Sequence, residues 1–493
     1  MSKLLSRFKR NAIDSFLADV GESNNYFVFV GGQSEYPTSD TPLEVDNEET
    51  LYRAREEMMF GKTANFIRMT KKYVWSSGTV YAQYDDTEDL TDKNFFVVTS
   101  TRDVFKCVYN NGGLPSTQQP TKRAFKLAVP VQESDGYEWL YLYTISNSDN
   151  TKFTTASYMP VVANTLISDS AKDGALFNIA VESRGIQYPS NSGNLTFSNT
   201  SVLRLASGAN TSVNYYRDSS LTAINTTTGN TYVRKILSSN SSLWVTTEAF
   251  PNNFLSNTDC VYYVGPTIEI ASRTGSGAVA YAIADTGSVD KIQILEYGSG
   301  YKDARVSIVS GPGLGSGASA RAIISPIGGH GSNVYDELYS DSLGVQCTFD
   351  EYGVANAFIS DVTYRTVGII KNPEDKDGNL YTSNTFNQIT TINTTGGAGT
   401  FSFGEVVRSL VSNSFGKFAY SNSSVVLLTG VTGVFQPGED ILGAVTNARR
   451  TVSAESMVVD LDTYSGEILY VQNIQEVTRS ENNTEQVKLV ISF

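Results

Sequence analysis

Residues Ser134–Ser146 read Ser-Asp-Gly-Tyr-Glu-Trp-Leu-Tyr-Leu-Tyr-Thr-Ile-Ser. The Asp-Gly pair predicts a turn, and aromatic residues then alternate with other residues at the period of two that is typical of a β-strand. One face of this strand is therefore aromatic, and burying it would anchor a domain core. We interpret the stretch as a core strand; a surface that stacks sugars or bases is the alternative. The aromatic face consists of Tyr137, Trp139, Tyr141 and Tyr143.

The composition predicts a mainly β protein of several domains. The chain has 493 residues, enough for more than one hydrophobic core, and only 18% of them are charged. Ser, Thr, Asn, Gly and Tyr are abundant, which favours strands and turns over helices. We therefore expect β-sandwich-like domains, with a few helices near the N-terminus.

The net charge of -14 argues against two kinds of partner. Phosphate backbones and anionic membrane surfaces would repel this chain on average, so we expect no nucleic acid and no membrane among its partners. No apolar run approaches the roughly 20 residues of a membrane-spanning helix. The N-terminus also lacks the apolar core of a signal peptide, so we expect a soluble protein that is not exported.

The residues that most often carry chemistry are few and scattered. The three cysteines, Cys107, Cys260 and Cys347, have no metal-ligand spacing, and we expect them to be buried thiols in a reducing compartment. The one histidine, His330, lies in a glycine-rich loop without a recognisable partner. We therefore predict no catalytic residue, no bound metal, no cofactor and no enzymatic activity. Paired carboxylates of the glycosidase type remain the chemistry that the sequence leaves open.

An amphipathic helix is predicted over residues 2–20. Its apolar stripe contains Leu5, Phe8, Ala12 and Phe16 and is widened by Leu4, Ile13 and Val20, with basic residues on the opposite side. Such a helix could lie on a membrane, but docking on the protein's own core or on a partner suits an acidic chain better.

A strand and a second helix follow. The run Tyr26–Val30 predicts a strand, and a capping box formed by Asp46 and Glu49 begins a helix that we expect to end at Gly61. The run Gly61–Thr63 resembles the tail of a phosphate-binding loop, but the earlier glycine of that motif is missing. We interpret it as a helix terminus.

Short strands with turn residues between them are predicted along most of the remaining chain. The predicted strands are 73–75, 79–84, 95–99, 104–109, 202–205, 212–216, 232–236, 243–247 and 261–264.

A glycine-rich segment occurs twice. Gly275–Ala282 recurs as Gly315–Ala322, and Tyr297–Tyr301 lies between the copies. The pattern Gly-x-Gly-x-x-Ala is that of a dinucleotide fingerprint, but strand-like alternation continues where a helix would have to begin. Duplicated hairpins are the simpler interpretation.

A second duplication lies nearer the C-terminus. Phe401–Val407 and Phe435–Ile441 share the pattern Phe-x-x-Gly-Glu-x-Val/Ile, which predicts a small β subdomain over 386–456. Before it, Asp375 and Asp377 suggest a calcium loop, but the first and twelfth ligand positions do not fit. A hairpin turn is the preferred interpretation.

Several separated segments resemble, in the same order, the dimeric baseplate wedge subunit of T4-like contractile-tailed phages. The aromatic strand with Asp-Gly-Tyr-x-Trp-x-Tyr-Leu is one of them. The chain departs from the family's C-terminal motif at Ile474, where the family has Arg, and both duplications look like insertions. The other similar segments are 1–37, 58–61 followed by Trp75, 105–107, 158–161, 368–373 and 466–493.

The resemblance implies a structural protein of the virion. It would be a homodimer in the tail baseplate, assembled in the host cytoplasm, and would scaffold other wedge proteins without chemistry of its own. The alternative function is a trimeric tail fibre or receptor-binding protein that could cleave polysaccharide. Candidate core or interface residues are Tyr137, Trp139, Tyr141, Tyr143 and Trp75.

The resemblance also suggests a division of the chain into three parts. Residues 1–165 would form a wedge-like module of helices and strands, and a glycine-rich β domain and the small β insertion would interrupt it. The module is completed by 360–385 and 457–493, the β domain spans 166–359, and the insertion spans 386–456.

Overall fold

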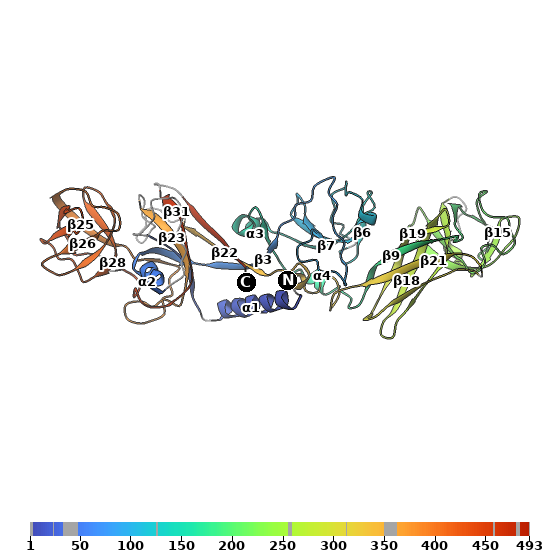
Figure 1. Cartoon of the computed structure of the whole chain (residues 1–493), viewed down its shortest axis with the longest axis horizontal. Coiled ribbons are helices and arrows are strands. Elements are labelled where there is room, and N and C mark those ends of the chain that lie inside the picture. Colours follow the sequence, from blue (N-terminus) through green and yellow to red (C-terminus); the bar gives the residue numbers. More distant parts are fainter. Residues whose placement is uncertain are drawn as a thin grey trace. The chain divides into compact units, whose positions relative to one another are not determined.

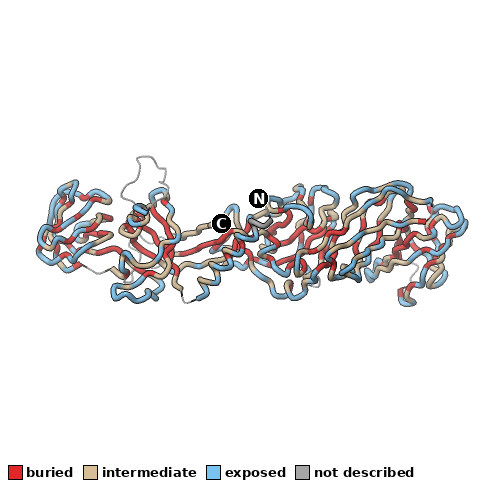
Figure 2. Tube along the Cα trace, turned by 60° about the horizontal axis from the view of Figure 1, so that its bottom comes forward, coloured by how far each residue is buried: buried red, intermediate tan, exposed pale blue. Residues whose placement is uncertain are grey.

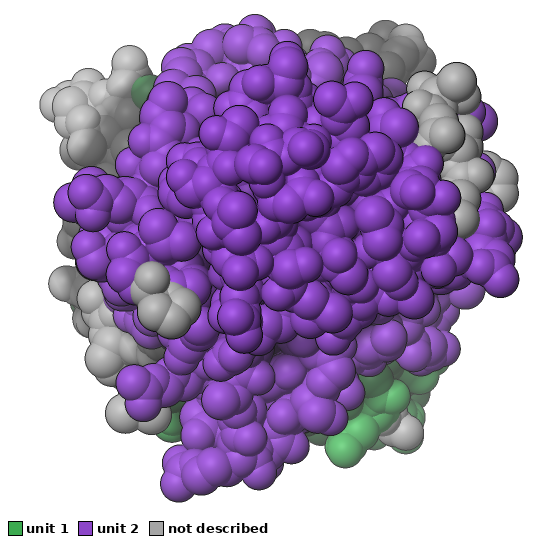
Figure 3. All heavy atoms as spheres, turned by 90° about the vertical axis from the view of Figure 1, so that its right-hand side faces the viewer, with its two compact units in different colours: residues 1–69, 148–160, 341–493 green, residues 70–147, 161–340 purple. Residues whose placement is uncertain are grey.

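The computed structural model shows a mainly β chain with several sheets, as the composition predicts (Figure 1). It describes residues 3–22, 24–32, 48–124, 127–254, 259–311, 313–349, 362–456, 459–479 and 484–492. The chain divides into two compact units, which Figure 3 distinguishes by colour. Unit 1 contains Met1–Met69, Ser148–Pro160 and Asp341–Phe493, and unit 2 contains Thr70–Asn147 and Val161–Ser340. The sequence-based division at 165 placed residues 70–147 with the N-terminal module, whereas here they belong to unit 2.

The first sheet of unit 1 is built around a strand that is buried on both faces. β1 (Tyr26–Gly31) is the middle strand of five, and all of its residues are buried. Tyr26, Val28 and Val30 belong to one core, and Phe27 and Phe29 belong to the core on the opposite face. The uninterrupted apolar run is therefore required by burial on both sides. The order is β24 (Thr385–Asn387), β2 (Met58–Thr63), β1, β23 (Thr363–Lys371) and β31 (Glu467–Thr478).

The N-terminal helix packs between this sheet and a second one. The helix prediction is confirmed by α1 (Lys3–Gly21), whose Phe16 ring lies 5.4 Å from Tyr26 and 5.2 Å from Phe66. Ile13 is fully buried and Phe16 and Val20 pack on the same core, as predicted, whereas Phe8 is 73% exposed. The second sheet has the order β32 (Glu485–Ser492), β22 (Ser342–Phe349), β3 (Asn65–Lys71) and β8 (Tyr158–Pro160).

The second predicted helix is wrong at its end. α2 spans Glu48–Glu56, and Met58–Thr63 is strand β2 instead of the last helical turn. The segment is a strand because it hydrogen-bonds to β1, and the apolar Met-Met-Phe run is thereby buried in the core of the sheet. Gly61 therefore lies within a strand. Asp46, the predicted cap, is outside the described residues.

Unit 1 also contains a closed barrel of six strands, which lies within the range 386–456 of the predicted small β subdomain. Around the barrel the order is β25-β28-β27-β26-β29-β30, so β25–β27 and β28–β30 exchange places under a two-fold rotation. The Phe-x-x-Gly-Glu copies precede the equivalent strands β26 and β29. The barrel strands are β25 (Thr390–Ala398), β26 (Val406–Ser409), β27 (Phe415–Ser421), β28 (Val425–Thr432), β29 (Asp440–Gly443) and β30 (Arg449–Val452).

The repeated glutamates hold turns of the opposite half of the barrel. Glu405 accepts hydrogen bonds from the backbone N–H of Thr446 at 3.0 Å and from its hydroxyl at 2.7 Å. Glu439 accepts the same pair of bonds from Ser412, at 3.2 Å and 2.9 Å. Burial alone would raise the pKa of each carboxyl, but these bonds outweigh burial and hold both pKa values below the ordinary range.

Replacing either barrel glutamate by alanine should destabilise the barrel by similar amounts. Glu405→Ala and Glu439→Ala each leave part-buried donors without an acceptor, which costs about 1–3 kcal/mol. Urea unfolding followed by circular dichroism measures both, with the exposed Gln436→Ala as control. A neutral Glu405→Ala together with a destabilising Glu439→Ala would contradict the two-fold equivalence.

In unit 2 the aromatic stretch forms strand β7 (Glu138–Thr144) of a small sheet, so the strand prediction is confirmed. The predicted strands 73–75 and 79–84 are wrong, because only the isolated bridges Val74–Val98 and Thr79–Ser116 form there. This segment instead crosses the sheet as a loop and packs its Tyr81 on Trp139. The sheet has the order β4 (Phe96–Val98), β5 (Asp103–Tyr109), β7 and β6 (Val131–Gln132).

The glycine-rich repeat belongs to a second two-fold arrangement of six strands. The order is β17-β20-β21-β9-β19-β18, and the end strands β17 and β18 contact each other. β9, β17 and β18 exchange with β19, β20 and β21, so the strand order around the ring is the same as in the unit 1 barrel. The strands are β9 (Leu176–Ile186), β17 (Thr267–Ala271), β18 (Ser276–Asp285), β19 (Ser288–Ser299), β20 (Arg305–Val309) and β21 (Ser316–Ile324).

Close packing of a tyrosine explains the repeated glycines. Tyr301 accepts a hydrogen bond from the Ala278 backbone N–H at 3.2 Å, and Tyr188 accepts one from Ala318 at 3.3 Å. A Cβ atom at Gly275 would lie 2.5 Å from Cγ of Tyr301, and the equivalent Gly315 meets Tyr188 in the same way. The predicted structural role of the glycines is confirmed, although the repeating unit is three strands and not a hairpin.

A seven-stranded sheet is inserted between β9 and β17 of the first copy. Residues 212–216 form turns there instead of the predicted strand. Buried and exposed stretches alternate along the chain (Figure 2). The strand order is β10 (Asn191–Asn194), β16 (Cys260–Gly265), β13 (Ser220–Asn225), β14 (Thr231–Ser239), β15 (Trp244–Thr247), β12 (Val202–Arg204) and β11 (Thr196–Phe197). Short helices elsewhere are α3 (Asn147–Phe153), α4 (Thr165–Ser168), α5 (Val334–Glu337), η1 (Asn111–Gly113) and η2 (Asn252–Phe254).

Candidate functional site

The aromatic face of β7 is buried in the small sheet of unit 2. Tyr137 and Trp139 stack with ring centroids 5.6 Å apart, and Tyr81 meets Trp139 edge-on at 5.5 Å. The Tyr137 hydroxyl donates a hydrogen bond to the carbonyl oxygen of Leu114 at 2.6 Å. Tyr141 and Tyr143 are 5% and 1% exposed. Because the ring faces are covered, they offer no surface for stacking a sugar or a base.

Trp75, the remaining candidate, is half-buried beside the same core. Its indole N–H donates to Oγ of Ser116 at 3.2 Å. The structure therefore brings Tyr137, Trp139, Tyr141 and Trp75 together in one core of unit 2. Tyr143 is buried but is not part of that core, because the β5–β7 register shifts between Tyr141 and Tyr143. The three cysteines are buried thiols, as expected.

The sequence analysis missed a buried charged cluster in unit 2. Lys106, on β5, contacts the Oε2 atom of Glu337 on α5, and its Nζ atom lies 2.5 Å from Nδ1 of His330. The exposed fractions of the three side chains are 0%, 3% and 1%. His330 is thus not a solvated loop residue, and its partners are 224 and seven positions away in the chain.

Aromatic rings enclose this cluster. The Nζ atom of Lys106 lies 4.6 Å from the centre of the Tyr84 ring, which favours a positive charge. Tyr84 also meets His330 edge-on at 4.8 Å, and Phe177 stacks on the other side of the imidazole at 4.8 Å. The orientation of the histidine is therefore set by both rings and by Lys106.

Burial changes the proton affinities of the three groups. It lowers the pKa of Lys106, and the neighbouring Glu337 charge opposes this only in part. Burial and the Lys106 charge together lower the pKa of His330 to about 4. Burial would raise the pKa of Glu337, but the Lys106 charge and His330 reverse this and lower it.

His330 should remain neutral down to acidic pH, which its own NMR signal can test. Its folded pKa of about 4 lies below the ordinary 6.5, so the stability it contributes is complete above pH 6.5 and falls as the pH drops towards 4. The full effect is about 3 kcal/mol. The chain has one histidine, so its imidazole resonance needs no assignment. A titration midpoint near the ordinary value would contradict this environment.

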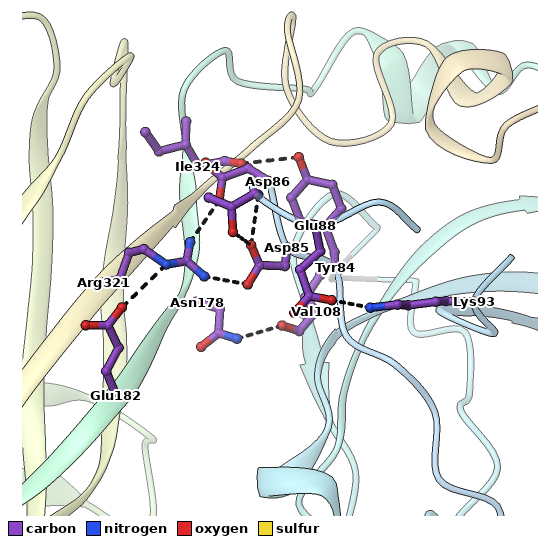
Figure 4. Close-up of polar contacts among 11 residues, drawn as sticks. Tyr84, Asp85, Asp86, Glu88, Lys93, Val108, Asn178, Glu182, Arg321 and Ile324 are labelled. Carbon is purple, nitrogen blue, oxygen red and sulfur yellow. Dashed lines mark hydrogen bonds and ion pairs between the residues drawn. The ribbon is translucent and has the colours of Figure 1, made fainter. Parts of the chain in front are cut away.

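A second polar network in unit 2 joins the small sheet to the six-stranded sheet (Figure 4). Arg321, on β21, binds Asp85 at 2.5 Å, Asp86 at 3.2 Å and Glu182 at 3.8 Å. Burial would raise the pKa of Asp85, but hydrogen bonds from Thr87 and Arg321 lower it. Burial dominates at Asp86 and raises its pKa.

Equivalent positions of the two strand repeats extend this network. Asn178 on β9 donates to the carbonyl oxygen of Val108 at 2.9 Å (Figure 4). Lys291 occupies the matching position on β19 and binds Glu138 at 2.8 Å, beneath the Tyr109 ring at 4.2 Å. We call these contacts the polar junction of unit 2. Its members are Asp85, Asp86, Lys106, Glu138, Asn178, Glu182, Lys291, Arg321, His330 and Glu337.

The charged groups of the polar junction are paired with one another. Within the described ranges, no group of three or more His, Cys, Asp or Glu side chains could hold a metal ion. After Gly275, the segment Gly275–Ala282 lies within strand β18, so it supplies no helix N-terminus for a dinucleotide. Asp375 accepts bonds from the N–H groups of Asp377 and Asn379, which confirms the hairpin turn.

No helix in the part of the chain that the structure describes has the length and apolar character needed to cross a bilayer. A comparison of the sequence with models of known protein families gives no match, and a comparison with curated proteins gives none either.

Proposed function

We propose that this chain is a structural subunit of the baseplate of a contractile phage tail, a wedge protein that works through protein–protein interfaces and catalyses no reaction on other molecules. It would form a homodimer and bind other wedge proteins in the virion. Support comes from the order of the resembling segments, from the multi-sheet β fold, and from a polar junction whose charges serve to hold sheets together.

The observation that carries the proposal is a pair of apolar turns on the unit 1 barrel. Val411 and Val445 each lie six residues beyond the repeated glutamate of their copy, and they are 78% and 75% exposed. The neighbouring Ser412 and Thr446 are the residues that the buried Glu439 and Glu405 hold. The fold thus fixes two turns that present large apolar side chains to solvent, which is typical of a surface that binds a protein partner.

Solution mass tests the assembly. Light scattering is expected to give a dimer, twice the mass of the 53.6 kDa chain. A stable trimer would contradict the wedge proposal and favour the fibre, and cleavage of host polysaccharide would then be the next assay.

Substitutions at the apolar turns test the interface. Val411→Asp and Val445→Asp should keep the circular dichroism spectrum and the unfolding midpoint, because both side chains are exposed. Together they should abolish co-purification with co-expressed wedge proteins, whereas Ser423→Asp on the same barrel should not. Normal co-purification of the double variant would exclude these turns as the interface.

A further inference from the structure

Lys106 and Glu337 meet in an enclosed site although 231 positions separate them in the sequence. Each side chain is almost fully buried, and the Lys106 amine contacts the carboxylate directly. An ion pair in such a place is expensive to desolvate, and removing both charges would relieve that penalty.

The two carboxylate oxygens of Glu337 have different surroundings. Oε1 accepts a hydrogen bond from the backbone N–H of Gly331. Oε2 contacts Lys106 and lies 3.6 Å from Nδ1 of His330. A backbone donor on Oε1 is suited to polarise a carbonyl, as in an oxyanion hole, and His330 is suited to protonate Oε2 as it leaves.

We propose that Lys106 and Glu337 condense to form an intramolecular isopeptide bond. The bond that forms joins Nζ of Lys106 to Cδ of Glu337, and the bond that breaks joins Cδ to Oε2. Two protons of the lysine ammonium leave with Oε2 as one water molecule. No oxidant, metal or other co-reactant is needed, and Oε1 becomes the oxygen of the new amide.

The surroundings favour the neutral groups that this reaction requires. Burial lowers the pKa of Lys106, so its amine is easily freed. His330 is neutral because its pKa is about 4, and its Nδ1 atom can take a proton from Nζ and pass it to Oε2. Once the ammonium has lost its proton, its charge no longer lowers the pKa of Glu337, and burial, the largest influence on this carboxyl, favours the carboxylic acid that is attacked.

The fold supplies the driving force for a reaction that free amines and acids do not undergo in water. Holding two groups in contact raises their effective concentration to about 10⁵–10⁸ M, far above that of water, and burial protects the amide from hydrolysis. The bond would close a loop that contains the six- and seven-stranded sheets of unit 2. It would covalently fasten β5 to α5.

The intact mass of the full-length, denatured protein tests whether the amide between Lys106 and Glu337 has formed. We expect a mass lower by one water molecule than the sequence mass, and we expect tryptic peptide 103–122 linked to peptide 322–365. A mass equal to that of the sequence would overturn the proposal. This measurement needs no variant and so does not depend on how well a variant folds.

Two lysine variants locate the bond. Lys106→Arg keeps the positive charge but has no amine, so its mass should equal its sequence mass. Lys291→Arg, at the other Lys–Glu pair of the polar junction, should still lack one water. A missing water in Lys106→Arg would place the modification elsewhere and overturn the proposal.

His330→Asn tests the proton carrier separately. The unlinked fraction of this variant should be larger than that of the natural protein at equal times after synthesis. An unlinked fraction equal to that of the natural protein would show that His330 takes no part in the reaction.

Discussion

Gly61→Ala is expected to destabilise unit 1 by about 3 kcal/mol, as overpacking of a closed core does. A Cβ atom at this position would lie 2.1 Å from Cζ of Phe386 on the neighbouring strand β24. Phe386 is fully buried and packs on Phe27 at 5.5 Å, so its ring has no room to withdraw. Urea unfolding followed by circular dichroism should show the loss.

Tryptophan fluorescence separates the two units in this experiment. All three tryptophans, Trp75, Trp139 and Trp244, belong to unit 2. The unfolding midpoint followed by tryptophan fluorescence should therefore shift much less than the midpoint followed by circular dichroism. Gly21→Ala is the matched control, since nothing lies within 4 Å of the added atom, and it should change stability by less than about 0.5 kcal/mol. A Gly61→Ala protein as stable as this control would show that β24 does not cover β2 closely.

Phe386→Leu should partly rescue the alanine variant. The smaller side chain leaves space for the added methyl group, so Gly61→Ala with Phe386→Leu should cost less than the sum of the two single changes. Strictly additive losses would mean that the two residues do not touch.

Lys106→Met is expected to destabilise unit 2 by about 3–5 kcal/mol, because it leaves the buried Glu337 without the lysine that it contacts and removes the proposed amide. The change leaves the Glu337 carboxylate 3% exposed and without its cation. Glu337→Leu leaves Lys106 buried without its carboxylate partner, and it should destabilise unit 2 by a similar amount. Urea unfolding followed by tryptophan fluorescence measures both.

The double variant Lys106→Met with Glu337→Leu should recover part of the lost stability, because no unpaired charge remains in the site. Its stability should lie between that of the natural protein and that of either single variant. Arg273→Met, which removes a surface partner of Asp303, is the control and should change little. A double variant less stable than both single variants would contradict the described pairing of Lys106 and Glu337.

The mainly β fold and its strongest strands could be predicted from local pattern. The period of two in Ser134–Ser146 and the apolar run of Tyr26–Val30 are both strands. Both copies of the second duplication lie in the barrel, because similar sequences adopt similar local structures. The failures at 73–75, 79–84 and 212–216 have a common reason. Alternation is a local signal, whereas a strand also needs a neighbour whose backbone groups are free to pair.

The polar junction could not be predicted in the same way. His330 carries no sequence signal that points to Lys106, and Arg321 lies 236 positions from Asp85. Such pairs are specified only when two distant strands are brought together. The tight match of Gly61 with Phe386 was hidden for the same reason, and Met58–Thr63 therefore looked like a helix end.

The sequence by itself determined the β character, the existence of two internal duplications and the burial of the aromatic strand, because these depend on composition, periodicity and repetition along the chain. Only the tertiary structure decided that each duplication closes into the same two-fold ring of six strands, and that residues 70–147 join unit 2. It also decided which charges are buried together. Strand pairing and charge pairing are non-local, so their energies depend on contacts that no short stretch of sequence contains.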